Sequence, residues 1–328
     1  MVCLMSSPFT PTRLAWPKNN LTQTMTLPPS LLPGDTIAIV CPAGYMPREK
    51  AQTCIDTLQQ WGYTVKIGST LGGISENYFS GNDDERLADL QAALDDPGVK
   101  AILCGRGGYG LSRIIDRIDF SRFRQSPKWI IGYSDITVLH SHIEAHFNIA
   151  TLHAPMAAAF NDGGSEDQYV ASLRQALIKD NTAYACPPHP FNRPGQVIAP
   201  LTGGNLALLA HLVGSSSSVG TEGKILFLED VGEYLYNIDR MLRQLKRSGR
   251  LDRLAGLLVG SFTDLKDTVR PFGATAEEIV RDCIKEYDYP VAYGFPVGHD
   301  KANVTLKTSV PYELRVTPDQ TFLSERGY

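Results

Sequence analysis

The chain contains 328 residues, which is enough for one large domain or two domains of ordinary size. Hydrophobic residues make up 43% of the chain and charged residues 20%, a composition typical of globular rather than disordered proteins. The 31 basic and 35 acidic residues give a formal net charge of −4, which argues against a general nucleic-acid binder. Because no run of about 18 apolar residues occurs, we predict no membrane-spanning helix.

Cysteine usage indicates a reducing compartment. The six cysteines are Cys3, Cys41, Cys54, Cys104, Cys186 and Cys283. None belongs to a C-x-x-C pair, so neither a zinc ribbon nor a redox dithiol is predicted. They are also too sparse for a disulfide scaffold. We therefore expect buried free thiols in a cytoplasmic protein.

The first 30 residues differ in composition from the rest of the chain. They contain serine, threonine and proline, two basic residues (Arg13 and Lys18) and no acidic residue. No continuous apolar segment follows a basic one, so a secretory signal is not predicted. We expect residues 1–30 to form a disordered leader.

Residues 31–160 read as alternating strands and helices. The predicted strands are at 36–40, 64–67, 100–104 and 128–131, and the predicted helices are at 47–61, 83–94 and from about 135 to 147. This alternation predicts an α/β domain with a parallel sheet covered on both faces. Ligands of such sheets bind at the carboxyl ends of the strands.

The pattern changes after residue 160. Proline and glycine are frequent in residues 161–195, which we interpret as a linker containing one helical segment. Residues 196–320 are predicted to form a second, α+β domain, with strands at 225–229, 255–260 and 291–294 and helices at 235–248 and 275–287. The segments 304–307 and 312–317 are predicted to pair as an antiparallel hairpin.

A glycine-rich loop, Gly105-Arg-Gly-Gly-Tyr-Gly110, follows the strand at 100–104 directly. Its spacing fits G-x-G-x-x-G, the pattern of dinucleotide-binding folds. A tight turn between strand and helix explains the glycines equally well. A third interpretation is a loop whose backbone N–H groups converge on a ligand oxygen.

Ser134 lies where a strand gives way to a helix, within Ile131-Gly-Tyr-Ser-Asp-Ile136. A serine on such a sharp turn resembles a nucleophile elbow, although Ile136 stands where the last glycine of G-x-S-x-G would be. The start of the helix would place free N–H groups and positive potential beside the hydroxyl. The alternative is that Ser134 simply caps the helix.

Two further segments place acid–base groups after apolar strands. Glu229 and Asp230 end the run Ile225-Leu-Phe-Leu228, where a carboxylate could orient a histidine or cap the next helix. His299 ends Tyr293-Gly-Phe-Pro-Val-Gly-His299, a rigid loop that makes it a candidate base, although a loop histidine without a catalytic role explains the segment equally well.

His142 and His146 lie one helical turn apart with Glu144 between them. The zincin pattern requires the glutamate next to the first histidine, so we expect no metal here and predict an exposed helix surface.

Five segments occur in an order that resembles the L,D-carboxypeptidases of serine peptidase family S66. They are Arg106-Gly-Gly-Tyr-Gly110, Gly132-Tyr-Ser-Asp135, Gly203-Gly-Asn-Leu206, Leu228-Glu-Asp-Val-Gly-Glu233 and Gly294-Phe-Pro-Val-Gly-His299. The resemblance runs from about Gly34 to Val316. It implies a flavodoxin-like N-terminal domain, similar in shape to class I glutamine amidotransferases, and a swivelling, β-rich C-terminal domain.

The resemblance also implies a catalytic triad that needs no metal and no cofactor. In it Ser134 is the nucleophile, His299 the general base and Glu229 the residue that orients His299. The implied oxyanion hole uses the backbone N–H of Asp135 and that of Gly107 or Gly108, and the sequence does not choose between these two glycines.

The implied substrate is a muropeptide that loses its terminal D-alanine, and a homodimer is expected. Arg106 and Tyr109 of the glycine-rich loop are candidate substrate contacts, because a guanidinium pairs well with a free carboxylate. Arg106 could equally be a structural ion-pair residue. The alternative within the peptidase class is a microcin C-type immunity peptidase. The alternatives from other classes are a dinucleotide-dependent enzyme and a muropeptide sensor without activity.

Overall fold

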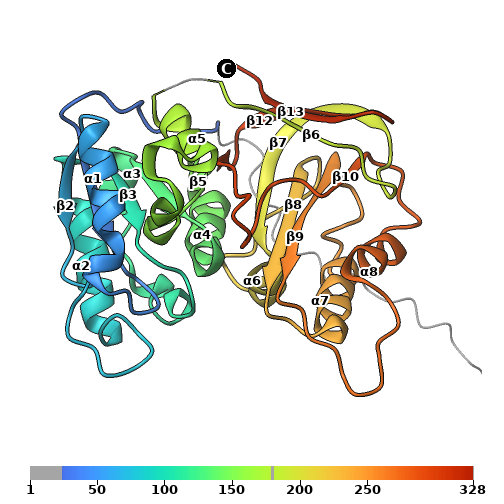
Figure 1. The fold of residues 1–328 in the computed structure, drawn as a ribbon, viewed down its shortest axis with the longest axis horizontal. Helices are drawn as coiled ribbons and strands as arrows, with labels where there is room; N and C mark the ends of the chain where they lie inside the picture. Colours follow the sequence, from blue (N-terminus) through green and yellow to red (C-terminus); the bar gives the residue numbers. More distant parts are fainter. Residues whose placement is uncertain (1–23, 179–180, 328) are drawn as a thin grey trace, which may run out of the picture.

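The computed structural model describes residues 24–178 and 181–327, and within them the chain forms two β-sheets flanked by helices. Figure 1 shows the N-terminal part, blue to green, on one side of the molecule and the C-terminal part, yellow to red, on the other. Helices α4 and α6 lie where the two parts meet. The predicted two-domain α/β architecture is confirmed.

The first sheet has the strand order β11-β5-β4-β3-β1-β2. Its strands are β1 (Thr36–Val40), β2 (Thr64–Ile67), β3 (Val99–Cys104), β4 (Trp129–Gly132), β5 (Leu152–His153) and β11 (Leu306–Lys307). All neighbours pair in parallel except β11, which runs antiparallel to β5. The parallel sheet expected from the alternating pattern is therefore present.

Alternation along β1 determines which helix each side chain meets. Ile37 and Ile39 share a core with Leu58 of α1, whereas Val40 shares a core with Leu90 of α2. Because successive side chains of a strand point to opposite faces, α1 packs on one face of the sheet and α2 on the other.

The second sheet has the order β10-β9-β8-β7-β12-β13-β6. Its strands are β6 (Ala183–Cys186), β7 (Gly195–Asn205), β8 (Ile225–Val231), β9 (Gly256–Thr263), β10 (Val291–Tyr293), β12 (Pro311–Val316) and β13 (Thr321–Glu325). The part from β10 to β7 is parallel, and the part from β7 to β6 is antiparallel. A mixed sheet of this kind lets β8 and β9 end at one edge, where their last residues can take part in a site.

The helices are α1 (Gln52–Gln60), α2 (Asp83–Asp95), α3 (Ser121–Gln125), α4 (Thr137–Phe147), α5 (Gln168–Leu177), α6 (Leu206–Leu212), α7 (Leu235–Arg247) and α8 (Ala276–Cys283). Ile238, Leu242 and Leu245, spaced three to four residues apart, form the buried stripe of α7. Among the described residues, none of these helices is long and apolar enough to cross a bilayer.

Helix α4 connects the two halves through polar contacts. The Glu144 carboxylate accepts from Lys224 Nζ at 2.6 Å and from Thr202 Oγ1 at 2.8 Å, both at the second sheet. At the other end of α4, Thr137 Oγ1 accepts from Asn205 N at 3.1 Å. The helix that follows Ser134 is thus attached to the second sheet at both ends.

The prediction that this helix, α4, has an exposed surface is wrong, because the second half of the chain covers it. His142 is buried, and its Nδ1 lies 2.9 Å from Ser217 Oγ. Burial lowers the pKa of His142 to about 4. His146 stacks on His142 with ring centroids 4.2 Å apart. Within the described ranges no group of three or more potential metal ligands gathers, here or elsewhere.

The predicted boundaries need three corrections. Residues 24–30, placed in the leader, are attached to the fold: Thr26 N donates to Asn148 O, and Pro29 O accepts from Trp129 Nε1. The predicted linker contributes α5 to the first core and β6 to the second sheet. The predicted hairpin does not form, because β11 joins the first sheet while β12 pairs with β13, beyond residue 320. Residues 1–23 of the predicted leader lie outside the described residues.

Candidate active site

Ser134 occupies a strained turn after β4. Its φ is 63°, a left-handed conformation that non-glycine residues rarely adopt and that costs about 1–3 kcal/mol. The serine begins the short 3₁₀ helix Ser134–Ile136, and no side-chain cap hydrogen bond is made there or at the start of α4. The helix-cap interpretation of Ser134 is therefore wrong. The geometry is that of a nucleophile elbow, with the side chain half-buried.

The glycine-rich loop lies directly over Ser134. A Cβ added to Gly107 would fall 2.7 Å from Ser134 Cβ, 2.9 Å from its Oγ and 3.3 Å from Asp135 N. A Cβ added to Gly108 would instead fall 2.7 Å from the Tyr78 hydroxyl. Of the two glycines that the sequence left open, Gly107 is the one beside Ser134.

The Asp135 side chain attaches this loop to the serine turn. Asp135 Oδ2 accepts from Leu111 N at 2.8 Å, and burial raises the pKa of this carboxyl to about 6. On the other side of the loop, the buried Arg86 donates to Pro42 O at 2.6 Å and to Gly110 O at 3.1 Å. Two buried side chains thus hold the end of the loop, at Gly110 and Leu111, which favours a preorganised site. The sequence analysis missed both side chains.

Gly110 leads into short 3₁₀ turns, Leu111–Arg113 and Ile115–Arg117, rather than into a long helix. Dinucleotide-binding folds place the pyrophosphate at the N-terminus of a helix that follows the glycines. The loop therefore lacks the element that the dinucleotide interpretation requires.

The second half of the chain brings Glu229 and His299 together. His299 Nδ1 and Glu229 Oε2 are 2.6 Å apart, and the Glu229 side chain is 0% exposed. With Nδ1–H donating to the carboxylate, the other ring nitrogen, Nε2, is left to accept a proton. This is the orientation that a general base requires.

Asp230, the neighbour of Glu229, has a different role. Its carboxylate accepts from Asn205 Nδ2 and from Ala207 N, both at 2.9 Å. It thus holds the start of α6, and not of α7 as the capping alternative supposed. Burial raises its pKa to about 6.

Tyr133 connects the serine turn to the histidine across the two halves of the molecule. Its ring meets the His299 ring edge-on with centroids 4.9 Å apart, and on its other side His153 lies at 5.8 Å. In the part of the chain that the structure describes, no hydrogen bond joins the Ser134 hydroxyl to His299. The sequence analysis missed Tyr133, although its position next to Ser134 was a usable signal.

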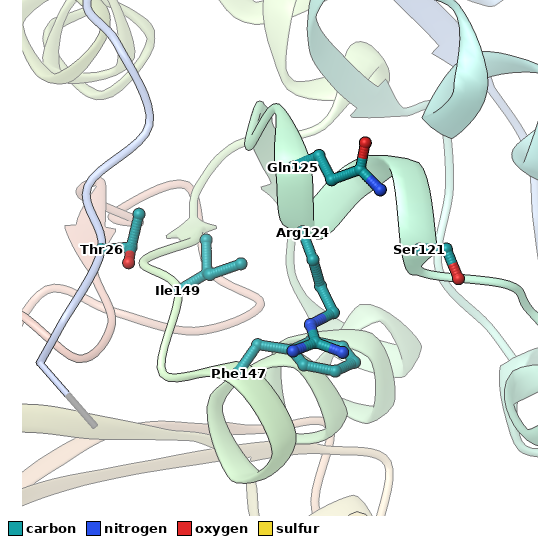
Figure 2. Close-up of a pocket in the computed structure, with 6 residues that line it drawn as sticks. All are labelled: Thr26, Ser121, Arg124, Gln125, Phe147 and Ile149. Carbon is teal, nitrogen blue, oxygen red and sulfur yellow. The ribbon is translucent and has the colours of Figure 1, made fainter. Parts of the chain in front are cut away.

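A pocket of about 250 Å³ opens beside His299. Tyr133, Tyr169 and Asn303 are among its lining residues. A second pocket, of about 420 Å³, lies around Phe147 at the far end of α4 from Ser134, where the Arg124 guanidinium stacks over the Phe147 ring (Figure 2). Only the first of these two pockets is lined by a residue of the predicted triad.

Arg106 and Tyr109 lie at the surface of the glycine-rich loop. Arg106 Nη1 donates to Tyr45 O at 2.8 Å, and within residues 24–178 and 181–327 it forms no ion pair. The structural ion-pair interpretation of Arg106 is therefore not supported there. Tyr109 is 47% exposed. Both side chains remain accessible to a ligand.

The comparisons with known proteins agree with this two-domain arrangement. Residues 37–154 match the model of the LD-carboxypeptidase N-terminal domain, and residues 199–314 match that of the C-terminal domain. The fold and these matches define a peptidase. The chain belongs to the LD-carboxypeptidase family, peptidase family S66, as the order of its motifs suggested.

Several relatives are similar over nearly their full length. A probable murein peptide carboxypeptidase of Bacillus subtilis is 36% identical over 305 residues, 92% of this chain and 94% of the relative. A murein tetrapeptide carboxypeptidase of Pseudomonas aeruginosa is 29% identical, over 81% of this chain and 89% of the relative.

Solved structures give the same result. A muramoyltetrapeptide carboxypeptidase from Oxalobacter formigenes matches with a TM-score of 0.80 and 30% identity, covering 89% of this chain and 99% of the other. The microcin protein MccF, in complex with glutamyl sulfamoyl guanosine, matches with a TM-score of 0.79 at 21% identity, over 91% of this chain and 98% of the other. This second likeness shows the fold alone.

Proposed function

We propose that the protein is a serine L,D-carboxypeptidase that releases the terminal D-alanine from murein tetrapeptides and so serves peptidoglycan recycling. The observation that carries the proposal is the 2.6 Å contact between His299 Nδ1 and Glu229. The His299 ring also contacts Tyr133, the residue before Ser134, whose backbone is strained. The names of the relatives support a murein peptide as the substrate.

In the first half of the reaction, Ser134 Oγ attacks the carbonyl carbon before the terminal D-alanine. Its proton passes to His299 Nε2, and Glu229 stabilises the imidazolium that forms. His299 then gives this proton to the leaving amine, so that free D-alanine departs and an acyl-serine ester remains. Water, deprotonated by the same imidazole, hydrolyses the ester and restores the hydroxyl.

The tetrahedral intermediate needs donors for its negative oxygen. We assign this oxygen to the space between Gly107 and the Asp135 N–H, where a carbon atom on Gly107 would lie 2.9 Å from the nucleophile. The first N–H groups of a helix lack intrahelical partners and carry positive potential. Such fixed donors stabilise an oxyanion without reorganisation.

An exopeptidase must also recognise the free carboxylate of its substrate. We propose that Arg106 binds it, because its guanidinium is exposed and free of ion pairs among the described residues. Tyr109, beside it, would contact the same end of the peptide.

Incubation with a disaccharide-tetrapeptide and analysis by mass spectrometry test the proposal. We expect the loss of one alanine, and Ser134→Ala should lower kcat by roughly 10⁴–10⁶-fold while the protein stays folded. Turnover close to wild type in this variant would exclude the mechanism. Saturable binding without release of alanine would indicate a muropeptide sensor instead.

The same preparation separates the remaining alternatives. Cleavage of an aminoacyl sulfamoyl nucleotide in preference to the tetrapeptide would favour a microcin C-type immunity peptidase. Uptake of NAD or NADP in equilibrium dialysis would favour a dinucleotide-dependent enzyme.

We also propose a cytoplasmic homodimer. The cysteines at positions 41, 54, 104, 186 and 283 are buried free thiols, which suits a reducing compartment. Cell fractionation tests the location, and light scattering after size-exclusion chromatography tests the dimer.

A further inference from the structure

The loop that carries His299 is attached to β9 before the histidine, where Ser261 N also donates to Val297 O at 2.9 Å, and it is closed on itself after the histidine. Phe295 N donates to Val259 O at 3.1 Å where the loop begins. Val304 N donates to Pro296 O at 2.9 Å where it closes. Val297 is the last residue before His299 that bonds to the sheet, so accurate placement of the imidazole also requires that Gly298 be held.

Gly298, the residue before His299, packs with its backbone directly on the sheet. Its φ is 142°, and an added Cβ would fall 2.2 Å from Ser261 Oγ and 3.2 Å from Glu229 Cβ. Residue 298 therefore has neither the space nor the conformation for a side chain. Hydrogen bonding of its backbone must define its position.

Asn303 supplies that hydrogen bond. Its Oδ1 accepts from Gly298 N at 3.2 Å, and the residue is 4% exposed. It also lines the pocket beside His299. A buried amide in this position joins the end of the loop to the residue that precedes the imidazole.

The other contacts of the His299 imidazole do not hold the loop at Gly298, whereas Asn303 does. Tyr133 meets the His299 ring through an aromatic edge, a contact that constrains direction less than a hydrogen bond does. Behind Tyr133, His153 is fully buried, and its imidazole lies beside the Asn303 side chain rather than holding His299. Glu229 fixes the imidazole only at Nδ1.

We propose that Asn303 is a positioning residue for the peptidase reaction: it holds Gly298, and thereby places the His299 imidazole between Glu229 and Ser134. This inference rests on the proposed catalytic triad. Asn303 does not touch the reacting atoms in this scheme, and it acts through the geometry of His299. Displacement of a catalytic group by about 1 Å can cost about 10²-fold in rate.

The test compares Asn303→Leu with Asn303→Asp, which differ little in shape. Leucine removes the acceptor for Gly298 N, whereas aspartate keeps it. We expect N303L to lower kcat about 10²-fold with KM within about threefold, and N303D to recover to within about tenfold of wild type. The downfield NMR signal of His299 Nδ1–H should broaden in N303L and persist in N303D.

Two results would overturn the inference: kcat of N303L within about threefold of wild type, or equal impairment of N303L and N303D. Urea unfolding shows whether a loss of activity is only a loss of folded protein. If N303L does not fold, Asn303→Ala replaces it in the same comparison. Asn237→Leu on α7, where the amide bonds Glu233 instead, is the matched control and should keep wild-type kcat.

Ser134→Ala separates this inference from the proposed function. If S134A is inactive while N303L retains full activity, only the role of Asn303 fails. If S134A retains activity, the proposed triad is wrong. The inference about Asn303 then fails as well, because it rests on that triad.

Discussion

Gly107 lies so close to Ser134 that a methyl group on residue 107 would stand 2.9 Å from the serine hydroxyl. That methyl group would fill the space that we assign to the oxyanion. We therefore expect Gly107→Ala, which keeps the backbone N–H but blocks this space, to lower kcat by about 10²–10³-fold, an effect as large as the loss of one oxyanion donor. Steady-state kinetics on a tetrapeptide measure the effect. Gly98→Ala, in a distant turn, is the control, and equal kinetics in the two variants would contradict the assignment.

Removal of the two neighbouring carboxylates should have different effects: a loss of activity at Glu229 and a loss of stability at Asp230. Glu229→Gln keeps the size of the side chain but loses the charge that favours the His299 imidazolium, so kcat should fall by about 10³–10⁴-fold with little change in stability. Asp230→Ala should instead lower the free energy of unfolding by about 1–3 kcal/mol, because Asn205 and Ala207 N lose their acceptor.

Kinetics and urea unfolding of both variants make this comparison. A large loss of kcat in folded D230A, together with an active E229Q, would reverse the two roles. The adjacent positions share a strand and its burial, so each variant serves as the control for the other.

The regular elements of this protein were predictable because their signals are local. The strand at 36–40 has the predicted bounds, and the helices around Asp83 and Leu235 begin as predicted. Burial of α4 was not predictable from its own residues. His142 and Glu144 look like surface residues until Ser217 and Lys224, about 75 to 80 residues further along the chain, cover them.

The residues of the site also divide into those that local sequence predicts and those that depend on distant parts of the chain. Ser134, Glu229 and His299 could be named because each lies in or after an apolar strand, within a segment that resembles a motif of the family. The partner of β11 could not be named, since two residues carry no signal for pairing and the partner strand, with His153, is in the other half of the chain. Asn303 was missed for a similar reason: its importance lies in one contact with the Gly298 backbone, and no pattern of residue types announces such a contact.

The contact between Glu144 and Lys224 should matter for holding the two halves together. Glu144→Ala leaves a largely buried ammonium without its carboxylate and removes the acceptor of Thr202, so we expect a loss of about 2–4 kcal/mol in the free energy of unfolding. Because Ser134 and His299 lie on opposite sides of this junction, activity should disappear at lower urea than secondary structure does. Lys224→Met is the companion variant, because it removes the ammonium and leaves the Glu144 carboxylate at the junction. Coincident loss of activity and structure in E144A would argue against the junction as the weak point.

Buried histidines predict how stability depends on pH. Burial lowers the pKa of His140 to about 4, while in the unfolded chain a histidine titrates near 6.5. Between these values the unfolded state binds the extra proton, so the contribution of His140 is full above pH 6.5 and is lost as the pH falls toward 4.

His140→Gln keeps a donor for Gly132 O but cannot titrate. The stability difference between wild type and H140Q should therefore shift against the wild type by about 1.4 kcal/mol per pH unit below 6.5, or about 2 kcal/mol at pH 5. The raised pKa values of Asp135 and Asp230 act with the opposite sign below pH 6, but they are common to both proteins and cancel in the difference. Urea unfolding from pH 7.5 to 5 measures this difference, and a value independent of pH would show that folding does not lower the pKa of His140.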